Sequence, residues 1–479
     1  MDALGRTRLR SLPRIAVLVT VVYLCVGSAP QMAAAAVSGS QVWESRYAWA
    51  GNDRATAMAS GPDGSEVFVT GYSTGSTTGV DFATASYDTS TGATLWVRRY
   101  NRLEGSNDFA NALGVSPDGS AVFVTGTSGG NDGADPDYVT VAYDASTGDM
   151  LWATRYAGPG GDRDTPTALE VSPDGTEVFV TGPSIGRRGD EDYATVAYDT
   201  ATGSQSWVRR HDGRGEGDDW PNALGVSADG SQVFVTGSSD GSILHRNTEY
   251  ATLAYDTATG ARSWIQRYKG PGDRSDAAID LAVSHDGSEV IVTGQGAGPE
   301  PSGANYATVA YAALTGVKLW VKRYNGPGDG ADRAIAVRLS PNDSVVAVTG
   351  ESDGTSGRSD YATVAYDAST GARLWSQRYD GASHLYDRAV AIGISSDGSQ
   401  VFVTGSSTES YFNTEYATLA YDAATGAELW IAHYQGPGRR SDAPADLAAS
   451  PEGLGVFVTG ASLGPRSNYD FATVAYASG

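Results

Sequence analysis

The stretch DYATVAYDASTGARLWSQRY, residues 360–379, decides the fold because the chain repeats it, lightly edited, along its length. Its first eight residues recur at a spacing of 55 to 57 residues, starting at positions 81, 137, 192, 249, 305, 360, 415 and 470. A second phrase, Val-Thr-Gly, ends an apolar run in each unit, with its glycine at 71, 126, 182, 237, 294, 350, 405 and 460. Self-similar units of this length indicate a repeat architecture in which each unit needs its neighbours to bury its faces.

Each unit is predicted to contain four short strands. In the unit that ends at residue 434, these strands are 387–398, 399–405, 415–422 and 427–434. The Asp-Gly and Thr-Gly pairs between them are hairpin signals. The middle two strands lack a polar face, so both of their faces must be covered. Four-stranded units packed around an axis predict an all-β fold, a single eight-bladed β-propeller over residues 37–479. An open solenoid is the alternative, but neither end of the chain resembles a polar cap.

The strand types also predict how the ring closes. The last copy of the repeated phrase, at 470–476, is not followed by a fourth strand. The stretch SGSQVWESRY, residues 38–47, carries the tryptophan and the Arg-Tyr ending of such a strand. We therefore expect residues 41–47 to form the outer strand of the last blade, hydrogen-bonded to residues 470–476, with Asp470 facing Arg46.

The stretch AYDASTGARLW, residues 365–375, resembles the tryptophan-docking motif of pyrroloquinoline-quinone-like β-propeller repeats, as found in secreted bacterial proteins. The motif, Ala-x-Asp-x-x-Thr-Gly-x-x-x-Trp, is complete in five units, while Ser86 replaces its alanine in one unit and Ala312 its aspartate in another. The resemblance covers the chain after residue 36. It implies that one tryptophan per blade is buried against the next blade. These are Trp43, Trp96, Trp152, Trp207, Trp264, Trp320, Trp375 and Trp430.

The same resemblance offers an enzymatic alternative, a quinoprotein dehydrogenase. In such enzymes, as the resemblance implies, a quinone lies on the propeller axis with a calcium ion held by Glu, Asn and Asp, an aspartate acts as base, and adjacent cysteines often form a disulfide. Here the only cysteine is Cys25, in the N-terminal segment, and the units are uniform in length without long pocket-building loops. Because this repeat serves enzymes and scaffolds alike, it does not identify an activity.

Other catalytic patterns are weak. The pattern Gly-x-Ser-x-Gly occurs six times, at 71–75, 126–130, 182–186, 237–241, 350–354 and 460–464, whereas a nucleophile is needed once, on a strand-to-helix turn. The five histidines do not pair at metal-ligand spacing. No EF-hand loop or phosphate-binding glycine loop is present in the sequence. We predict no catalytic residue and no cofactor, with Ca²⁺ as the ion to consider.

Two sets of acidic residues recur in the units. The first begins the third strand, eighteen residues before a basic residue, as Asp360 before Arg378. In a tight hairpin these positions lie opposite each other, so we expect a cross-strand ion pair. The second set precedes the first strand, which is innermost in a propeller, so we expect its carboxylates to ring one mouth of the central channel. They either shape their loops by accepting backbone N–H bonds, or form a cation site or an acidic mouth for a basic ligand. This aspartate ring comprises Asp53, Asp108, Asp164, Asp219, Asp276, Asp332, Asp387 and Asp442.

The first 36 residues have the features of a secretory signal peptide. Four arginines precede an apolar run, residues 15–27, and small residues up to Ala36 offer a cleavage site. An uncleaved anchor is the alternative, but the run is short for a membrane span. Without residues 1–36 the chain holds 29 basic and 55 acidic residues, a formal net charge of −26. Such an acidic surface disfavours nucleic acid and anionic membranes as partners.

Together these features favour a secreted, extracellular, monomeric propeller that binds or scaffolds without catalysis. Its unknown protein or glycan ligand is expected on the face that carries the longer loops. The alternative is a propeller enzyme of the quinoprotein dehydrogenase or glycan-active type. An enzyme should break the repeat in one or two units with unique polar residues, and GSSDGSILHRNTEY, residues 237–250, is among the few distinctive loops.

Overall fold

The computed structural model describes residues 37–479 except 76–78, 103–105, 130–134, 215–216, 243–244, 273, 300–302, 411–412, 439, 454 and 466–467. The expected signal peptide, residues 1–36, lies outside the described residues. The described part of the chain contains only strands, turns and loops. It accordingly offers no helix with the length and apolar character needed to cross a membrane.

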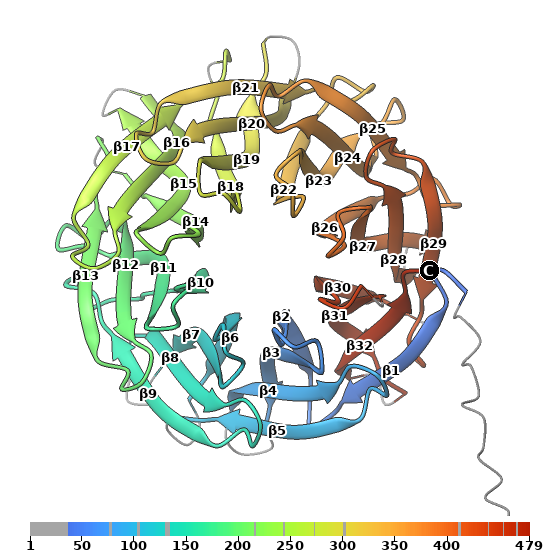
Figure 1. Ribbon diagram of the computed structural model, residues 1–479, viewed down its shortest axis with the longest axis horizontal. Helices are drawn as coiled ribbons and strands as arrows, with labels where there is room; N and C mark the ends of the chain where they lie inside the picture. Colours follow the sequence, from blue (N-terminus) through green and yellow to red (C-terminus); the bar gives the residue numbers. More distant parts are fainter. Residues whose placement is uncertain are drawn as a thin grey trace, which may run out of the picture. The chain divides into compact units, whose positions relative to one another are not determined.

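Eight antiparallel sheets of four strands form the compact unit Ala36–Gly479. The sheets stand around a central axis as the blades of a β-propeller (Figure 1). The prediction of an all-β, eight-bladed propeller is therefore confirmed.

Each blade has an innermost, a second, a third and an outermost strand. The innermost strands are β2 (Asp53–Ser60), β6 (Asp108–Val115), β10 (Ala168–Val171), β14 (Trp220–Val226), β18 (Ala277–Val283), β22 (Asp332–Leu339), β26 (Asp387–Ile394) and β30 (Asp442–Ala449). The second strands are β3 (Glu66–Thr74), β7 (Ala121–Ser128), β11 (Glu177–Ile185), β15 (Gln232–Ser242), β19 (Glu289–Ala297), β23 (Val345–Asp353), β27 (Gln400–Ser410) and β31 (Gly455–Leu463).

The third strands are β4 (Val80–Asp88), β8 (Asp137–Asp144), β12 (Glu191–Asp199), β16 (His245–Asp256), β20 (Ala304–Ala312), β24 (Ser359–Asp367), β28 (Asn413–Asp422) and β32 (Tyr469–Ala477). The outermost strands are β5 (Thr94–Tyr100), β9 (Met150–Tyr156), β13 (Gln205–His211), β17 (Arg262–Tyr268), β21 (Lys318–Tyr324), β25 (Arg373–Tyr379), β29 (Glu428–Tyr434) and β1 (Gln41–Tyr47). We number the blades in chain order, so blade one holds β2–β5 and blade eight holds β30–β32 and β1.

The two faces of the ring differ in their connections. The loop face carries the loops between second and third strands and those that lead from one blade to the next. The turn face carries the short turns between first and second and between third and fourth strands. The two kinds of turn meet there, since the Thr89 hydroxyl donates a 2.6 Å hydrogen bond to the carbonyl of Gly64.

Blade eight is completed by the N-terminal strand, as predicted. β1 pairs antiparallel with β32, with Trp43 opposite Ala475 and Tyr47 opposite Phe471. Figure 1 shows the blue strand β1 lying along the red strand β32. The ring therefore closes by hydrogen bonds between the two ends of the propeller unit, and no blade is left incomplete.

The Val-Thr-Gly phrase is explained by the close approach of the innermost and second strands. In blade one a Cβ atom on Gly71 would lie 2.0 Å from the carbonyl oxygen of Arg54, so a larger residue would force the strands apart. The register of the two strands shifts nearby, between Ala55 and Ala57. Val67, earlier in the same run, is fully buried because the neighbouring blades cover both faces of the sheet.

The docking tryptophans lie at the junctions between blades. Trp375 is 7 % exposed, and its Nε1–H donates a 2.8 Å hydrogen bond to the carbonyl of Ala423 in the next blade. A Cβ atom on Gly426, in the Thr-Gly turn of that blade, would lie 2.6 Å from the indole ring. At the closure of the ring, Gly39 takes this glycine's place against Trp430. The Nε1 atom of Trp430 has no hydrogen-bond partner among the described residues.

An arginine clamp joins neighbouring blades near the loop face. The Arg378 guanidinium lies 2.7 Å from the Asp360 carboxylate and also donates to the hydroxyls of Ser352 and of Tyr324 in the preceding blade. The predicted cross-strand pair of an acidic and a basic residue is thereby confirmed in seven blades; in blade seven the base is His433, and in the other six it is arginine. The arginine pairs are Asp81–Arg99, Asp137–Arg155, Asp192–Arg210, Glu249–Arg267, Asp360–Arg378 and Asp470–Arg46.

Two blades depart from the arginine clamp. In blade seven His433 replaces the arginine and its Nδ1 lies 2.5 Å from a Glu415 oxygen. In blade five Asn305 replaces the acid, and Arg323 donates instead to the carbonyl of Ala297 at 2.7 Å. The clamp is thus a structural device that tolerates substitution in single blades.

Candidate binding site in the axial channel

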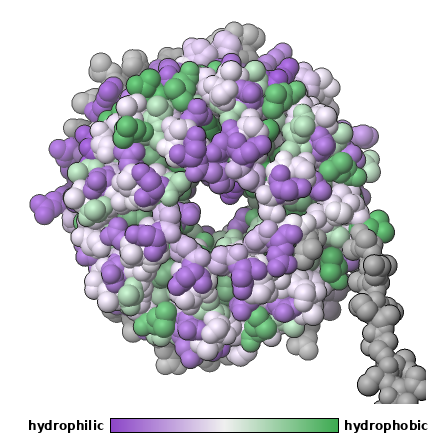
Figure 2. Space-filling view, viewed as in Figure 1, coloured by the Kyte–Doolittle hydropathy of each residue, from purple (hydrophilic) through white to green (hydrophobic). Residues whose placement is uncertain are grey.

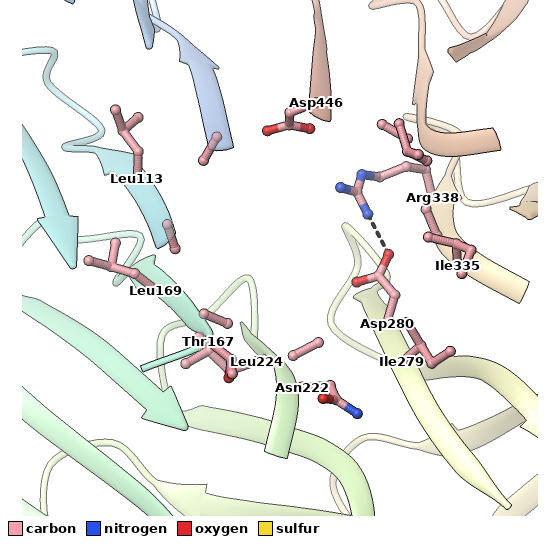
Figure 3. Close-up of a pocket in the computed structure, with 17 residues that line it drawn as sticks. Leu113, Thr167, Leu169, Asn222, Leu224, Ile279, Asp280, Ile335, Arg338 and Asp446 are labelled. Carbon is pink, nitrogen blue, oxygen red and sulfur yellow. Dashed lines mark hydrogen bonds and ion pairs between the residues drawn. The ribbon is translucent and has the colours of Figure 1, made fainter. Parts of the chain in front are cut away.

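A cavity of about 300 Å³ lies on the propeller axis, lined by the innermost strands. Much of its wall is apolar, with Leu113, Leu169, Leu224, Ile279 and Ile335 around it (Figure 3). The space-filling view shows an open centre bordered by hydrophilic residues (Figure 2). Charged side chains on the axis are therefore reachable from solvent.

Four charged residues break the repeat at this axis. Four residues after the ring aspartate, six blades have alanine, but blade five has Asp280 and blade eight has Asp446. Six residues after it, six blades have glycine or alanine, but blade three has Glu170 and blade six has Arg338. We call Glu170, Asp280, Arg338 and Asp446 the axial charges.

The axial charges are only partly paired. The Arg338 guanidinium lies 2.9 Å from the Asp280 carboxylate, as the dashed line in Figure 3 shows. Asp446 extends from β30, on the side of the Arg338 guanidinium away from Asp280 (Figure 3), and accepts a 2.9 Å hydrogen bond from the backbone N–H of Met58 in blade one. Within the described part of the chain, neither Asp446 nor Glu170 forms a direct ion pair. Asp280 is thus neutralised by Arg338, whereas Asp446, which also lines the cavity, is not.

The surroundings shift the pKa values of these groups. The walls of the channel raise the pKa of Asp446 to about 6 and shift the pKa of the more exposed Glu170 in the same direction, and Arg338 opposes both shifts. The Arg338 guanidinium loses water, but the carboxylates around it outweigh this effect and raise its pKa. The axis therefore holds one permanent cation and two carboxyl groups with raised pKa values.

The aspartate ring expected at the loop-face mouth lies inside the blades. All eight members are fully buried, and none lines the axial cavity. Asp387 illustrates their contacts, because its oxygens accept the backbone N–H groups of Gly381 at 2.7 Å and Thr408 at 3.1 Å. Each other member likewise accepts at least one backbone N–H. Burial raises the pKa of these carboxyls, led by Asp219 at about 6. The loop-shaping interpretation describes these contacts, and cation binding stays a prediction.

Two groups of carboxylates on the loop face bring their oxygens within 4.8 Å of one another. One group is Asp190, Asp192 and Asp212, and the other is Asp360, Asp380 and Asp387. The second group includes a member of the aspartate ring. Because Asp192 and Asp360 already bind clamp arginines, part of their charge is neutralised. Asp387 is the only ring member in these two groups, which were found among the described residues.

An exposed acidic ring is present on the turn face, where the sequence reasoning did not place one. It follows the innermost strands, in the turns whose Asp-Gly pairs serve as hairpin signals. Asp118 is an example. Hydrogen bonds from Ser116 and Ser120 lower the pKa of its carboxyl to about 2 and keep it ionised. This turn-face ring comprises Asp63, Asp118, Asp174, Asp229, Asp286, Asp397 and Glu452, with Asn342 at the equivalent position in blade six.

Five of the six Gly-x-Ser-x-Gly serines belong to the clamp, and Ser128 is the exception among the described residues. Ser352 accepts from Arg378, and the equivalent serine does so in four other blades, at Ser73, Ser184, Ser239 and Ser462. None of these five serines contacts a histidine in the described structure. In these five blades the serine therefore helps to hold the clamp arginine.

Comparison with known proteins places the fold. A family model described as "Outer membrane protein assembly factor BamB" matches residues 84–244 and 218–448. A search of curated proteins gave no match to the sequence.

Solved propellers resemble the chain in structure. Sqt1 from Chaetomium thermophilum, solved bound to the N-terminus of the ribosomal protein L10, has a TM-score of 0.59 and 15 % identity, covering 90 % of this chain and 98 % of its own. The quinohemoprotein alcohol dehydrogenase from Comamonas testosteroni has a TM-score of 0.52 and 13 % identity, covering 92 % of this chain and 76 % of its own. At such identities the likeness concerns the fold alone, and it includes both a binding protein and an enzyme.

Proposed function

Because the chain belongs to the BamB-like family of pyrroloquinoline-quinone-type propellers, we propose that it is a secreted, non-catalytic binding protein that holds its ligand at the axial channel. The observation that carries the proposal is the position of the axial charges. The eight blades are otherwise close copies, and Glu170, Asp280, Arg338 and Asp446 replace alanine or glycine where the blades converge. Charged side chains placed around a cavity suit recognition of a polar ligand.

A bound quinone fits this axis poorly. Pyrroloquinoline quinone is a planar tricarboxylic acid, so its site needs cations and flat surfaces. The described lining offers one cation, Arg338, against the carboxylates of Asp280 and Asp446, and it includes no aromatic side chain. Glu170 adds a further negative charge in reach of Arg338. Coulomb repulsion would therefore weaken the binding of an anionic quinone.

Non-catalytic action is also supported by the contacts of the repeated acids and serines. The ring aspartates are held by backbone N–H groups, and the serines hold arginines. These groups are occupied by interactions that maintain the blades. The described axis pairs no nucleophile with a general base.

A glycan ligand on the loop face is the second candidate. Trp49, Trp220 and Tyr386 lie in or beside loops of that face and are 60 %, 48 % and 53 % exposed. Exposed aromatic rings offer flat apolar surfaces with a polar edge, which suit sugar rings. This is the face on which the sequence led us to expect a protein or glycan ligand.

The test combines enzyme and binding assays on the purified protein. The protein is incubated with pyrroloquinoline quinone and Ca²⁺, gel-filtered, and assayed for retained quinone and for dye reduction with alcohols and aldoses. We expect neither. Peptide and glycan arrays, with product analysis by chromatography, should give saturable binding without turnover. Retained quinone together with dye reduction would show that the protein is an enzyme and overturn the proposal. Absence of binding to any peptide or glycan would also contradict it.

A further inference from the structure

We infer that the axial cavity is a site for an alkylammonium ligand, in which a methylene chain lies against the apolar lining and carries a primary ammonium group to the carboxylate of Asp446, while Glu170, which follows the lining residue Leu169 on β10, adds negative charge beside the cavity. This inference rests on the proposed binding function and names its ligand class. It starts from the charge balance of the cavity. Arg338 neutralises Asp280 at 2.9 Å, while Asp446 and Glu170 have no cation in direct contact within the described residues. A cationic ligand supplies what these two groups lack.

The apolar wall selects the kind of cation. Leucine and isoleucine side chains from blades two to six line the cavity beside the carboxylates. A methylene chain gains free energy when such a wall removes it from water, whereas a hydrated inorganic ion does not. Combined apolar and acidic lining therefore matches an amine on an aliphatic chain, as in a diamine or a lysine side chain.

The spacing of the carboxylates argues against a metal ion. Calcium is held by six to eight oxygens close together, at about 2.3–2.6 Å from the ion. The groups of three acidic residues that approach within 4.8 Å of one another, in the part of the chain that is described, do not include Asp446, Asp280 or Glu170. Among the described residues, no three acidic groups that include an axial carboxylate therefore lie close enough to share one ion.

The turn face would attract such a ligand toward the channel. The turns that follow the innermost strands carry the turn-face ring of six aspartates and Glu452. Glu170 stands next to the end of its strand β10, at Val171, and so lies on the side of the channel nearest this ring. An acidic mouth focuses the field and raises the local concentration of cations. Asn342 interrupts the ring in blade six, the blade that supplies Arg338.

The experiment is titration calorimetry of the full chain with putrescine, at about pH 8, where both axial acids are ionised and the amine is still protonated. Salt is kept at about 150 mM to suppress non-specific binding to the acidic surface. We expect saturable binding at one site per chain. Butanediol, of similar length and without charge, should not bind. A short lysine peptide forms the second arm, which distinguishes a free amine from a protein side chain as the source of the ammonium group.

Isosteric variants test the site. Asp446→Asn should weaken putrescine or peptide binding by about tenfold or more, and Glu170→Gln, beside the cavity, should weaken it less. Arg338→Gln should tighten binding, because it frees Asp280, whereas a merely structural role for Arg338 predicts weaker binding. The matched control is Asp149→Asn. This variant removes a carboxylate that is 77 % exposed in the turn between β8 and β9 on the turn face, and it should leave binding unchanged. Melting curves verify that each variant is folded.

The inference is overturned if neither amine binds the wild type, if Asp446→Asn and Asp149→Asn behave alike, or if Ca²⁺ competes with putrescine at equal concentration. These outcomes are independent of the quinone assay. A protein that binds a different ligand without turnover would keep the proposed function and lose the alkylammonium site.

Discussion

Arg46 and Asp470 are separated by 424 residues in the sequence and joined by an ion pair of 2.8 Å in the structure. Arg46 lies on β1 and Asp470 on β32, so the pair ties together the two strands that close the ring. Their side chains are 20 % and 12 % exposed, which limits screening by solvent. Asp470→Asn should therefore lower the free energy of unfolding by about 1–3 kcal/mol. Thermal and urea unfolding measure the loss, and Asp149→Asn should change stability by less than about 0.5 kcal/mol. Equal effects of the two variants would show that this ion pair does not stabilise the closure.

Trp375 should be a major contributor to the contact between blades six and seven. Its indole is buried against Gly426 and bonded to the Ala423 carbonyl. Trp375→Ala should cost about 3–5 kcal/mol, because it leaves a cavity between the blades. Trp375→Phe keeps much of the packing and should lose mainly the hydrogen bond, about 1 kcal/mol. Unfolding in urea gives both values, and a near-neutral alanine variant would contradict the docking role.

Gly39 allows steric contact to be separated from backbone strain. Gly39 and Gly357 both have a φ of +74°, which is unfavourable for other residues. A Cβ atom on Gly39 would lie 2.9 Å from the Trp430 ring, whereas one on Gly357 would meet nothing within 4 Å. Both alanine variants should lose about 1 kcal/mol from strain. Gly39→Ala should lose distinctly more in melting experiments, and equal losses would mean that the Trp430 contact is adaptable.

His433 makes the stability of blade seven dependent on pH. Its hydrogen bond to Glu415 raises the pKa of the imidazole, and the carboxylates of Glu409 and Asp387 add to this effect. Because the pKa of His433 is higher in the folded state, its stabilising effect is complete at pH values below the pKa of about 6.5 in the unfolded chain. The effect is lost as the pH rises through the pKa in the folded protein.

His433→Arg restores the clamp residue of most other blades and stays charged. The variant should therefore show a flatter melting temperature between about pH 6 and pH 9 than the wild type. Differential scanning calorimetry across this range makes the comparison. A wild-type curve that does not fall relative to the variant above neutral pH would contradict the assignment.

Calcium binding to the aspartate ring is a prediction from the sequence that calorimetry can decide. The carboxylates of Asp360, Asp380 and Asp387 form the arrangement most suited to it. If the ion binds there, Ca²⁺ should raise the melting temperature by mass action, and Asp380→Asn should remove the increase. Asp149→Asn again serves as the control. Absence of heat and of any shift would leave the aspartates with their loop-shaping role alone.

The blades and the closure could be predicted because their signals recur in every unit. A single glycine or tryptophan says little about the fold, but the same residue at eight equivalent positions determines how many strands of each type the chain contains. The position of Trp43 in the outermost strand of blade eight follows from that number. The ion pairs followed in the same way from the fixed spacing between Asp360 and Arg378. Such features depend on local hairpin geometry, which the repeat reveals.

The candidate site could not be predicted in the same way. Asp280, Asp446, Glu170 and Arg338 stand in different blades, so their convergence depends on the complete ring. A comparison of the innermost strands, residue by residue, would have exposed them as departures from alanine and glycine. The burial of Asp387 could not be predicted from the sequence either, because it depends on how the loops before and beside its strand fold over its carboxylate.

The antiparallel pairing of β1 and β32 has a mechanical consequence. Gln41, at the start of β1, lies opposite Tyr476, near the end of β32, whereas Tyr47 lies opposite Phe471. The chain segments that leave this strand pair therefore depart side by side. Tension applied between them loads the hydrogen bonds one after another, beginning with those between Gly39, Ser40 and Ala477, and does not load them all at once. The propeller should yield to pulling first at this seam, releasing β1 at low force while the other seven blades hold.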